Sequence, residues 1–79
     1  MTAISIQTIQ SIFNNIERAD VNENMKNLIE DDIIDSMDMM KLIIEIEKIF
    51  NKPLNSKYIT PDNFKNFQSI KNMLQEAMA

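Results

Sequence analysis

The chain contains no glycine, and only two of its 79 residues are proline. Glycine and proline are the residues that most often end helices and form tight turns, so their scarcity favours helix. The first apolar residues recur with the 3.6-residue period of a helix: Ile6, Ile9, Ile12, Phe13 and Ile16. We therefore predict an all-α fold, with residues 1–79 forming one domain, since a chain this short builds a single core.

The pattern predicts four helices, over about residues 3–18, 36–50, 61–65 and 67–77. Thr2 or Ser5 caps the first of them. Thr60 and Pro61 supply a cap and a proline at the first helical position, which predicts the short third helix. Asn66 caps the fourth helix. The expected fold is a small four-helix bundle of three longer helices and one short one, with a long loop between the first two.

The composition argues against an enzyme. The chain has no cysteine and no histidine, so it lacks a thiol nucleophile, the commonest general base and the usual zinc ligands. Without glycine it cannot form the phosphate-binding loop of nucleotide-binding proteins. We therefore expect a protein that performs no catalysis of its own.

The charge and the hydropathy limit the kinds of partner and the cellular compartment that we expect. The net charge is -4 and the sequence pI is about 4.6. Such a surface repels nucleic acid and anionic membranes. No apolar run is long enough to span a bilayer, and the first seven residues lack the basic and apolar regions of a signal peptide. We expect a cytoplasmic monomer that neither binds nucleic acid nor inserts into membranes.

The helix over 36–50 has more apolar surface than one core needs. On a helical wheel, one broad face gathers Met39, Leu42, Ile43, Ile46, Ile49 and Phe50. The apolar strip, which is Met37, Met40 and Ile44, falls on the other side. Either the bundle wraps further round and buries the strip, or the strip is an exposed docking surface. Methionine suits docking, because a flexible thioether side chain repacks against different partners.

Ser36 and Asp35 stand at the start of this helix. A phosphodiester on the Ser36 hydroxyl would lie near unpaired backbone N–H groups and the positive end of the helix dipole. The Asp35 carboxylate could share a Mg²⁺ ion with an incoming pyrophosphate. Both residues are also ordinary helix caps, and the pair alone favours that interpretation.

The residues that follow change the interpretation. The segment over 34–38 has the sequence Ile-Asp-Ser-Met-Asp, and it is followed at helical spacing by Leu42, Ile46, Glu47 and Phe50. This segment, with the order of predicted helices, resembles the acyl carrier and peptidyl carrier protein family, whose hallmark is Asp-Ser-Leu at the head of the second helix. The resemblance extends from the first helix to about Leu74. It implies that Ser36 receives 4'-phosphopantetheine from coenzyme A, and that Asp35 supports the attachment.

The resemblance also implies the cargo chemistry and the partners. The thiol at the end of the arm would bear an acyl or aminoacyl group as a thioester. The partners would be a phosphopantetheinyl transferase, an acyl- or aminoacyl-activating ligase, and downstream synthase or transferase enzymes. Fatty acyl, polyketide, D-alanine and other amino acid cargoes all use this scaffold, so the cargo stays open.

Two departures from the family pattern bear on docking. Met37 replaces the usual leucine, and Ile34 stands where glycine or alanine often precedes the Asp-Ser pair. The resulting run Ile-Asp-Ser-Met is more similar to D-alanyl carriers and to freestanding carriers of specialised pathways. Lysines also occupy the exposed side of the helix, which argues against a housekeeping fatty-acid role. The candidate docking residues are Met37, Asp38, Met40, Lys41, Ile44, Glu47 and Lys48. We expect docking to depend more on the apolar strip than on the acidic residues.

Other features have simpler interpretations. The acidic residues at 30–32 and Asp35 lack the spacing and glycine of a calcium loop, so we predict a solvated loop and no metal site. Tyr58, Phe64 and Phe67 are candidate core aromatics, or residues at the entrance for a tethered chain. A Lys41–Glu45 pair is expected on the helix surface. The alternative function is an unmodified helical adaptor that docks a partner through the apolar strip.

Overall fold

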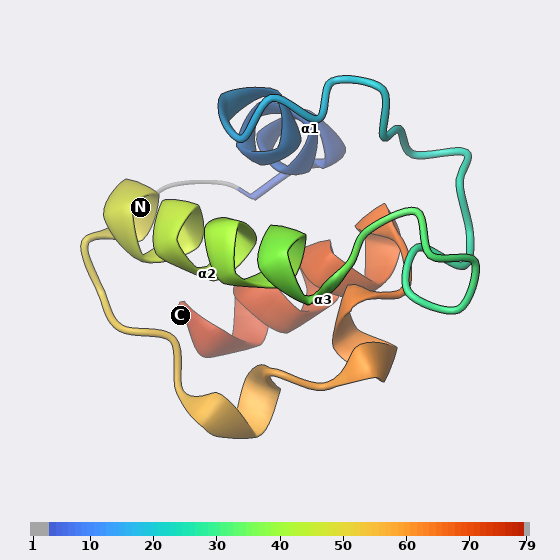
Figure 1. The fold of residues 1–79 in the computed structure, drawn as a ribbon. Coiled ribbons are helices and arrows are strands. Elements are labelled where there is room, and N and C mark those ends of the chain that lie inside the picture. Colours follow the sequence, from blue (N-terminus) through green and yellow to red (C-terminus); the bar gives the residue numbers. More distant parts are fainter. Residues whose placement is uncertain (1–3, 79) are drawn as a thin grey trace.

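Three α-helices and two 3₁₀ turns make up the computed structural model, which describes residues 4–78 (Figure 1). In chain order they are α1 (Ile6–Asn15), α2 (Ser36–Phe50), η1 (Ser56–Tyr58), η2 (Pro61–Phe64) and α3 (Phe67–Ala77). No strand occurs among the described residues. The prediction of an all-helical fold is therefore confirmed for this part of the chain. The short third helix is a 3₁₀ turn, and η1 was not predicted.

The first helix is shorter than predicted. Ser5 caps it, and its hydroxyl accepts a hydrogen bond from the Thr8 N–H at 3.3 Å, whereas Thr2 lies outside the described residues. The prediction that the helix continues to residue 18 is wrong. Glu17 has φ 64°, a left-handed conformation that ends the helix, and the Arg18 N–H turns back to the Phe13 carbonyl at 2.9 Å.

The second helix has the predicted bounds because both of its ends are capped. Asp35 is the N-cap, and its carboxylate accepts a hydrogen bond from the Asp38 N–H at 2.9 Å. The Asp38 carboxylate accepts one in return from the Asp35 N–H at 3.3 Å, which completes a capping box. At the other end, Asn51 has φ 51° and closes the helix in the left-handed region that asparagine tolerates.

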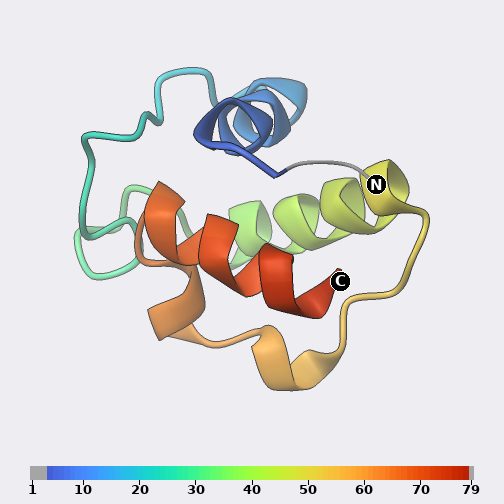
Figure 2. The ribbon, with the colours of Figure 1, turned by 180° about the vertical axis from the view of Figure 1, so that it is seen from behind.

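The core lies where the three helices meet, with α3 crossing behind α2 and below α1 (Figure 1, Figure 2). The rings of Phe13 on α1 and Phe67 on α3 are stacked, with centroids 5.0 Å apart. The other buried side chains of the core are Ile9, Ile12, Val21, Leu28, Ile34, Leu42, Ile46, Leu54, Phe64, Ile70, Met73 and Leu74. α3 has the predicted bounds and the predicted Asn66 cap, whose side chain accepts from the Ser69 N–H at 2.7 Å.

The long loop between α1 and α2 is pinned to this core. Leu28 and Ile34 are fully buried, and Ile33 is half-buried. The Leu28 N–H donates to the Lys65 carbonyl, and the Ile34 N–H donates to the Leu28 carbonyl, both at 2.9 Å. The loop therefore holds the start of α2 in a fixed place against the core.

Candidate functional site

Ser36 is the first residue of α2 and is exposed. Its side chain makes no hydrogen bond to the described residues, so the hydroxyl is accessible and not committed to capping. The cap is Asp35 instead. The interpretation of the pair as ordinary helix caps is confirmed for Asp35 and is wrong for Ser36, which is the first helical residue.

The Asp35 carboxylate is held in its ionised form beside this hydroxyl. The hydrogen bond from the Asp38 N–H lowers the pKa of Asp35 below its ordinary value of 3.8, with smaller contributions from the Met37 N–H and the positive charge of Arg18. The site therefore offers a hydroxyl, a permanent carboxylate and the positive end of a helix dipole within one turn.

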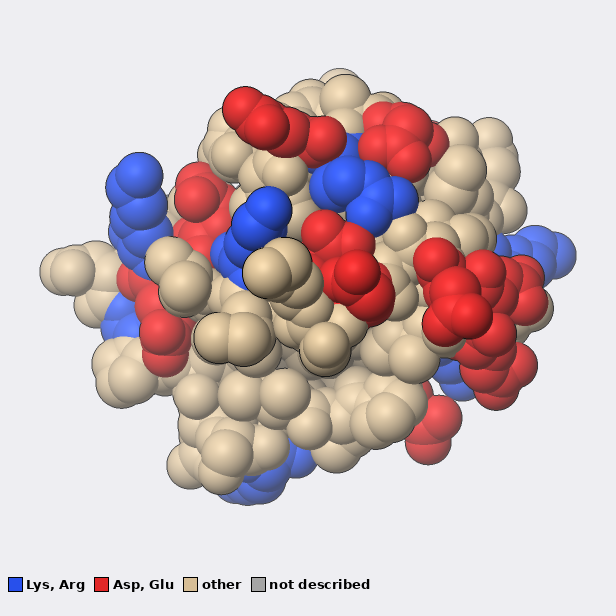
Figure 3. Space-filling model, viewed as in Figure 1, with Lys and Arg blue, Asp and Glu red and all other residues tan. Residues whose placement is uncertain are grey.

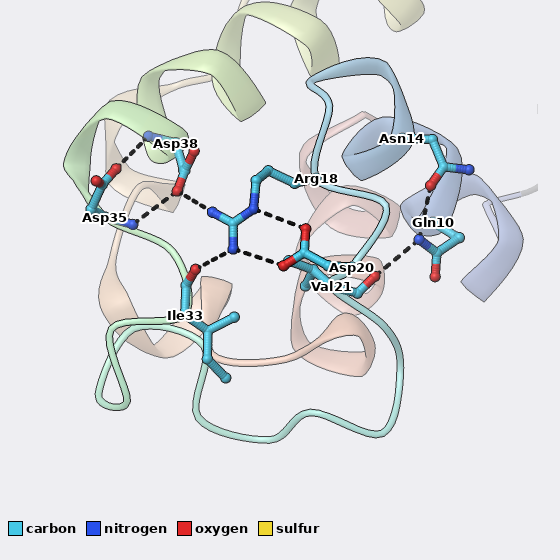
Figure 4. Close-up of polar contacts among 8 residues, drawn as sticks. All are labelled: Gln10, Asn14, Arg18, Asp20, Val21, Ile33, Asp35 and Asp38. Atoms are coloured by element: carbon cyan, nitrogen blue, oxygen red, sulfur yellow. Dashed lines mark hydrogen bonds and ion pairs between the residues drawn. The ribbon is translucent and has the colours of Figure 1, made fainter.

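Arg18 ties the start of α2 to the preceding loop, a role that was not predicted (Figure 4). Its Nη1 donates to Asp38 Oδ2 at 2.6 Å and its Nη2 to the Ile33 carbonyl at 2.6 Å. The same guanidinium donates to both carboxylate oxygens of Asp20, at 3.1 and 3.2 Å. The side chains of Arg18 and Asp38 are only 25% and 14% exposed. Arg18 therefore fixes the conformation of the backbone that leads into Ser36.

An open hollow of about 350 Å³ adjoins Ser36. The loop, the first turn of α2 and the segment before η2 all contribute to its walls: Ile29, Asp32, Ile34, Asp35, Ser36, Met39, Ile59, Thr60 and Pro61. Most of this lining is apolar. Phe64 and Phe67 are buried in the core, which confirms the prediction that they are core aromatics, and neither lines the hollow. Tyr58 is half-buried, and the Lys57 ammonium lies 5.1 Å from its ring centroid.

The apolar strip is exposed. Met37, Met40 and Ile44 retain 67%, 64% and 61% of their accessible surface, which excludes the interpretation that the bundle buries them. Ile49 was predicted to face the core but is 42% exposed, because the core against α2 centres on Leu42 and Ile46. Three large apolar side chains at spacings of three and four residues are typical of a surface that another molecule covers.

The charged candidates on α2 separate into two groups. The Asp38 carboxylate is bonded to Arg18, and Glu47 Oε2 accepts from the Leu54 N–H at 2.8 Å, so both acids stabilise the fold itself. Lys41 and Lys48 are exposed. The predicted Lys41–Glu45 pair does not form; Glu45 Oε1 instead accepts from Asn15 Nδ2 at 3.0 Å. Acidic side chains gather mainly over the loop before α2 (Figure 3).

No group of three or more acidic side chains within residues 4–78 is placed to hold a metal ion. None of the helices described is long and apolar enough to cross a membrane.

Comparison of the chain with protein-family models, with curated proteins and with solved structures finds no match.

Proposed function

We propose that the protein is a carrier that bears an acyl or aminoacyl group as a thioester on a 4'-phosphopantetheine arm attached to Ser36. The observation that carries the proposal is the exposed Ser36 hydroxyl at the head of α2, without a hydrogen-bonding partner and beside the ionised Asp35. The three α-helices with η2 in place of a short third helix would then form a carrier-type four-helix bundle.

The attachment is a phosphoryl transfer from coenzyme A. The Ser36 oxygen would attack the phosphorus that bears the pantetheine, the phosphoanhydride bond would break, and adenosine 3',5'-bisphosphate would leave. The transferase would remove the hydroxyl proton, since the described residues within reach of Ser36 include no histidine. Asp35 would help to hold the Mg²⁺ ion that neutralises the pyrophosphate.

The residues around Ser36 fit the attached group. The exposed position leaves room for a phosphodiester, and the positive end of the α2 dipole favours its negative charge. The apolar hollow beside Ser36 can hold the first part of the arm. The thiol that carries the cargo arrives with the arm, which is consistent with a chain that contains no cysteine.

The test is the intact mass of the purified protein after incubation with coenzyme A, Mg²⁺ and a phosphopantetheinyl transferase of broad specificity. We expect the gain of one phosphopantetheine, and its complete loss in Ser36→Ala. Ser56→Ala is the matched control, because Ser56 is also an exposed first residue of a helical turn, with Asn55 as its cap. Asp35→Asn preserves a capping side chain but should slow the modification. An unchanged mass of the wild-type chain contradicts the proposal.

A second function is supported by the exposure of the apolar strip alone. An adaptor that is never modified would also present Met37, Met40 and Ile44 to a partner helix. The variant Ser36→Ala separates the two functions. An adaptor keeps full partner binding in this variant, whereas a carrier loses all transfer of cargo.

A further inference from the structure

The exposed charges of α2 lie asymmetrically about the apolar strip. At 100° per residue, Lys41 and Lys48 project along one edge of the strip, two turns apart, and Glu47 projects along the opposite edge. Glu47 is half-buried and is bonded to the Leu54 N–H, whereas both lysines are exposed. A molecule that covers the strip therefore meets two ammonium groups along one side.

The acids of α2 are less accessible to a partner than these lysines. Asp38 is neutralised by Arg18 at 2.6 Å, with only 14% of its side chain exposed. The Glu45 carboxylate turns towards α1, where it accepts from Asn15. At physiological ionic strength, salt screens the electrostatic effect of the net charge of -4 beyond about 8 Å. The charges that a partner contacts directly therefore decide which partner binds.

A hollow continues the strip on the lysine side. It has a volume of about 310 Å³ and lies between the end of α1 and the middle of α2, with Ile16, Ile44 and Lys41 in its lining. Glu17, which follows α1, and Glu45 of α2 also line it. An apolar side chain of a partner can enter this hollow while a carboxylate on a neighbouring residue of the partner forms an ion pair with Lys41.

We propose that α2 docks a partner surface whose apolar side chains are flanked on one side by carboxylates, and not a basic patch. The proposal rests on the proposed function, because it names the chemistry of the enzymes that a carrier would visit. It assigns recognition to the apolar strip together with Lys41 and Lys48, and it assigns Asp38 and Glu47 to the stability of the fold.

The test uses two synthetic amphipathic helical peptides with the same leucine face, one flanked by glutamates and the other by lysines. Binding to the full chain is measured by NMR titration at physiological ionic strength, where the net charge of the chain is screened. We expect the glutamate peptide to bind about five-fold tighter, the effect of two exposed ion pairs. Its shifts should map to Met37, Met40 and Ile44. The double variant Lys41→Glu/Lys48→Glu should reverse the preference, with an unchanged melting temperature showing that its fold is intact.

Equal binding of the two peptides, tighter binding of the lysine peptide, or binding of neither overturns the proposal. So does a shift pattern that lies away from α2. The double variant Lys57→Glu/Lys65→Glu changes two exposed lysines outside α2, so it is the matched control and should keep the wild-type preference. Failure of the proposed function is seen separately, as an unmodified Ser36 in the mass measurement, whichever peptide binds more tightly.

Discussion

The interaction of Arg18 with the start of α2 gives the sharpest prediction about stability. Arg18→Met keeps most of the aliphatic stem but removes the guanidinium. The Asp38 carboxylate, 14% exposed, and the Ile33 carbonyl then lose donors that lie 2.6 Å away. Loss of partly buried, charge-assisted hydrogen bonds costs about 2–3 kcal/mol of unfolding free energy. In a domain of this size, that lowers the melting temperature by about 10–20 °C.

The assay is urea and thermal unfolding followed by circular dichroism. Asp20→Asn is the matched control, because Asp20 binds the same guanidinium but is 64% exposed, and its loss should leave the stability close to that of the wild type. The reasoning is refuted if Arg18→Met unfolds within about 0.5 kcal/mol of the wild type, or if Asp20→Asn is equally destabilising.

Three further outcomes follow from local geometry. Glu17→Gly should stabilise the fold by about 0.5–1 kcal/mol, since Glu17 has φ 64°, which glycine adopts without steric strain. Asn51→Gly should raise the stability less, because asparagine tolerates this conformation. A loss of stability in Glu17→Gly would contradict this prediction. Phe67→Ala should cost about 3–5 kcal/mol and leave the chain largely unfolded by circular dichroism, because it removes the ring stacked on Phe13. The pKa of Asp35 is lower in the folded protein than its ordinary value of 3.8. Asp35 therefore stabilises the fold fully above pH 3.8, and this stabilisation is lost as the pH falls through the lower folded pKa. Asp35→Asn should therefore weaken the dependence of the unfolding free energy on pH at acid pH, and an unchanged dependence refutes this.

The parts of the fold that the sequence predicted well are those with strong local signals. α2 and α3 have their predicted bounds because their caps, Asp35 and Asn66, are residue types that can be recognised as helix caps in the sequence. The end of α1 was not predictable from periodicity. Ile16 keeps the apolar spacing, but the chain leaves the helix at Glu17, where the absence of glycine hides the usual stop signal.

The candidate site was predicted in part for the same reason. Ser36 and the apolar strip lie on one helix, so a helical wheel places them correctly. The role of Arg18 depends on contacts with residues up to 20 positions away, which no local pattern records. One signal was present: Arg18 is the single arginine among eight basic residues, and its planar group suits several simultaneous acceptors better than lysine does. The hollow beside Ser36 depends on how residues 59–61 approach α2, a tertiary relation that the sequence does not show.

The most direct measurement is the intact mass of this chain isolated from the cell that makes it, with peptide fragmentation to locate any added group. The carrier account predicts a chain heavier by a phosphopantetheine, with or without a thioester-linked cargo, and fragment ions that place the addition on Ser36. A chain recovered only at the mass of its bare sequence, or carrying the group on a different residue, would contradict it.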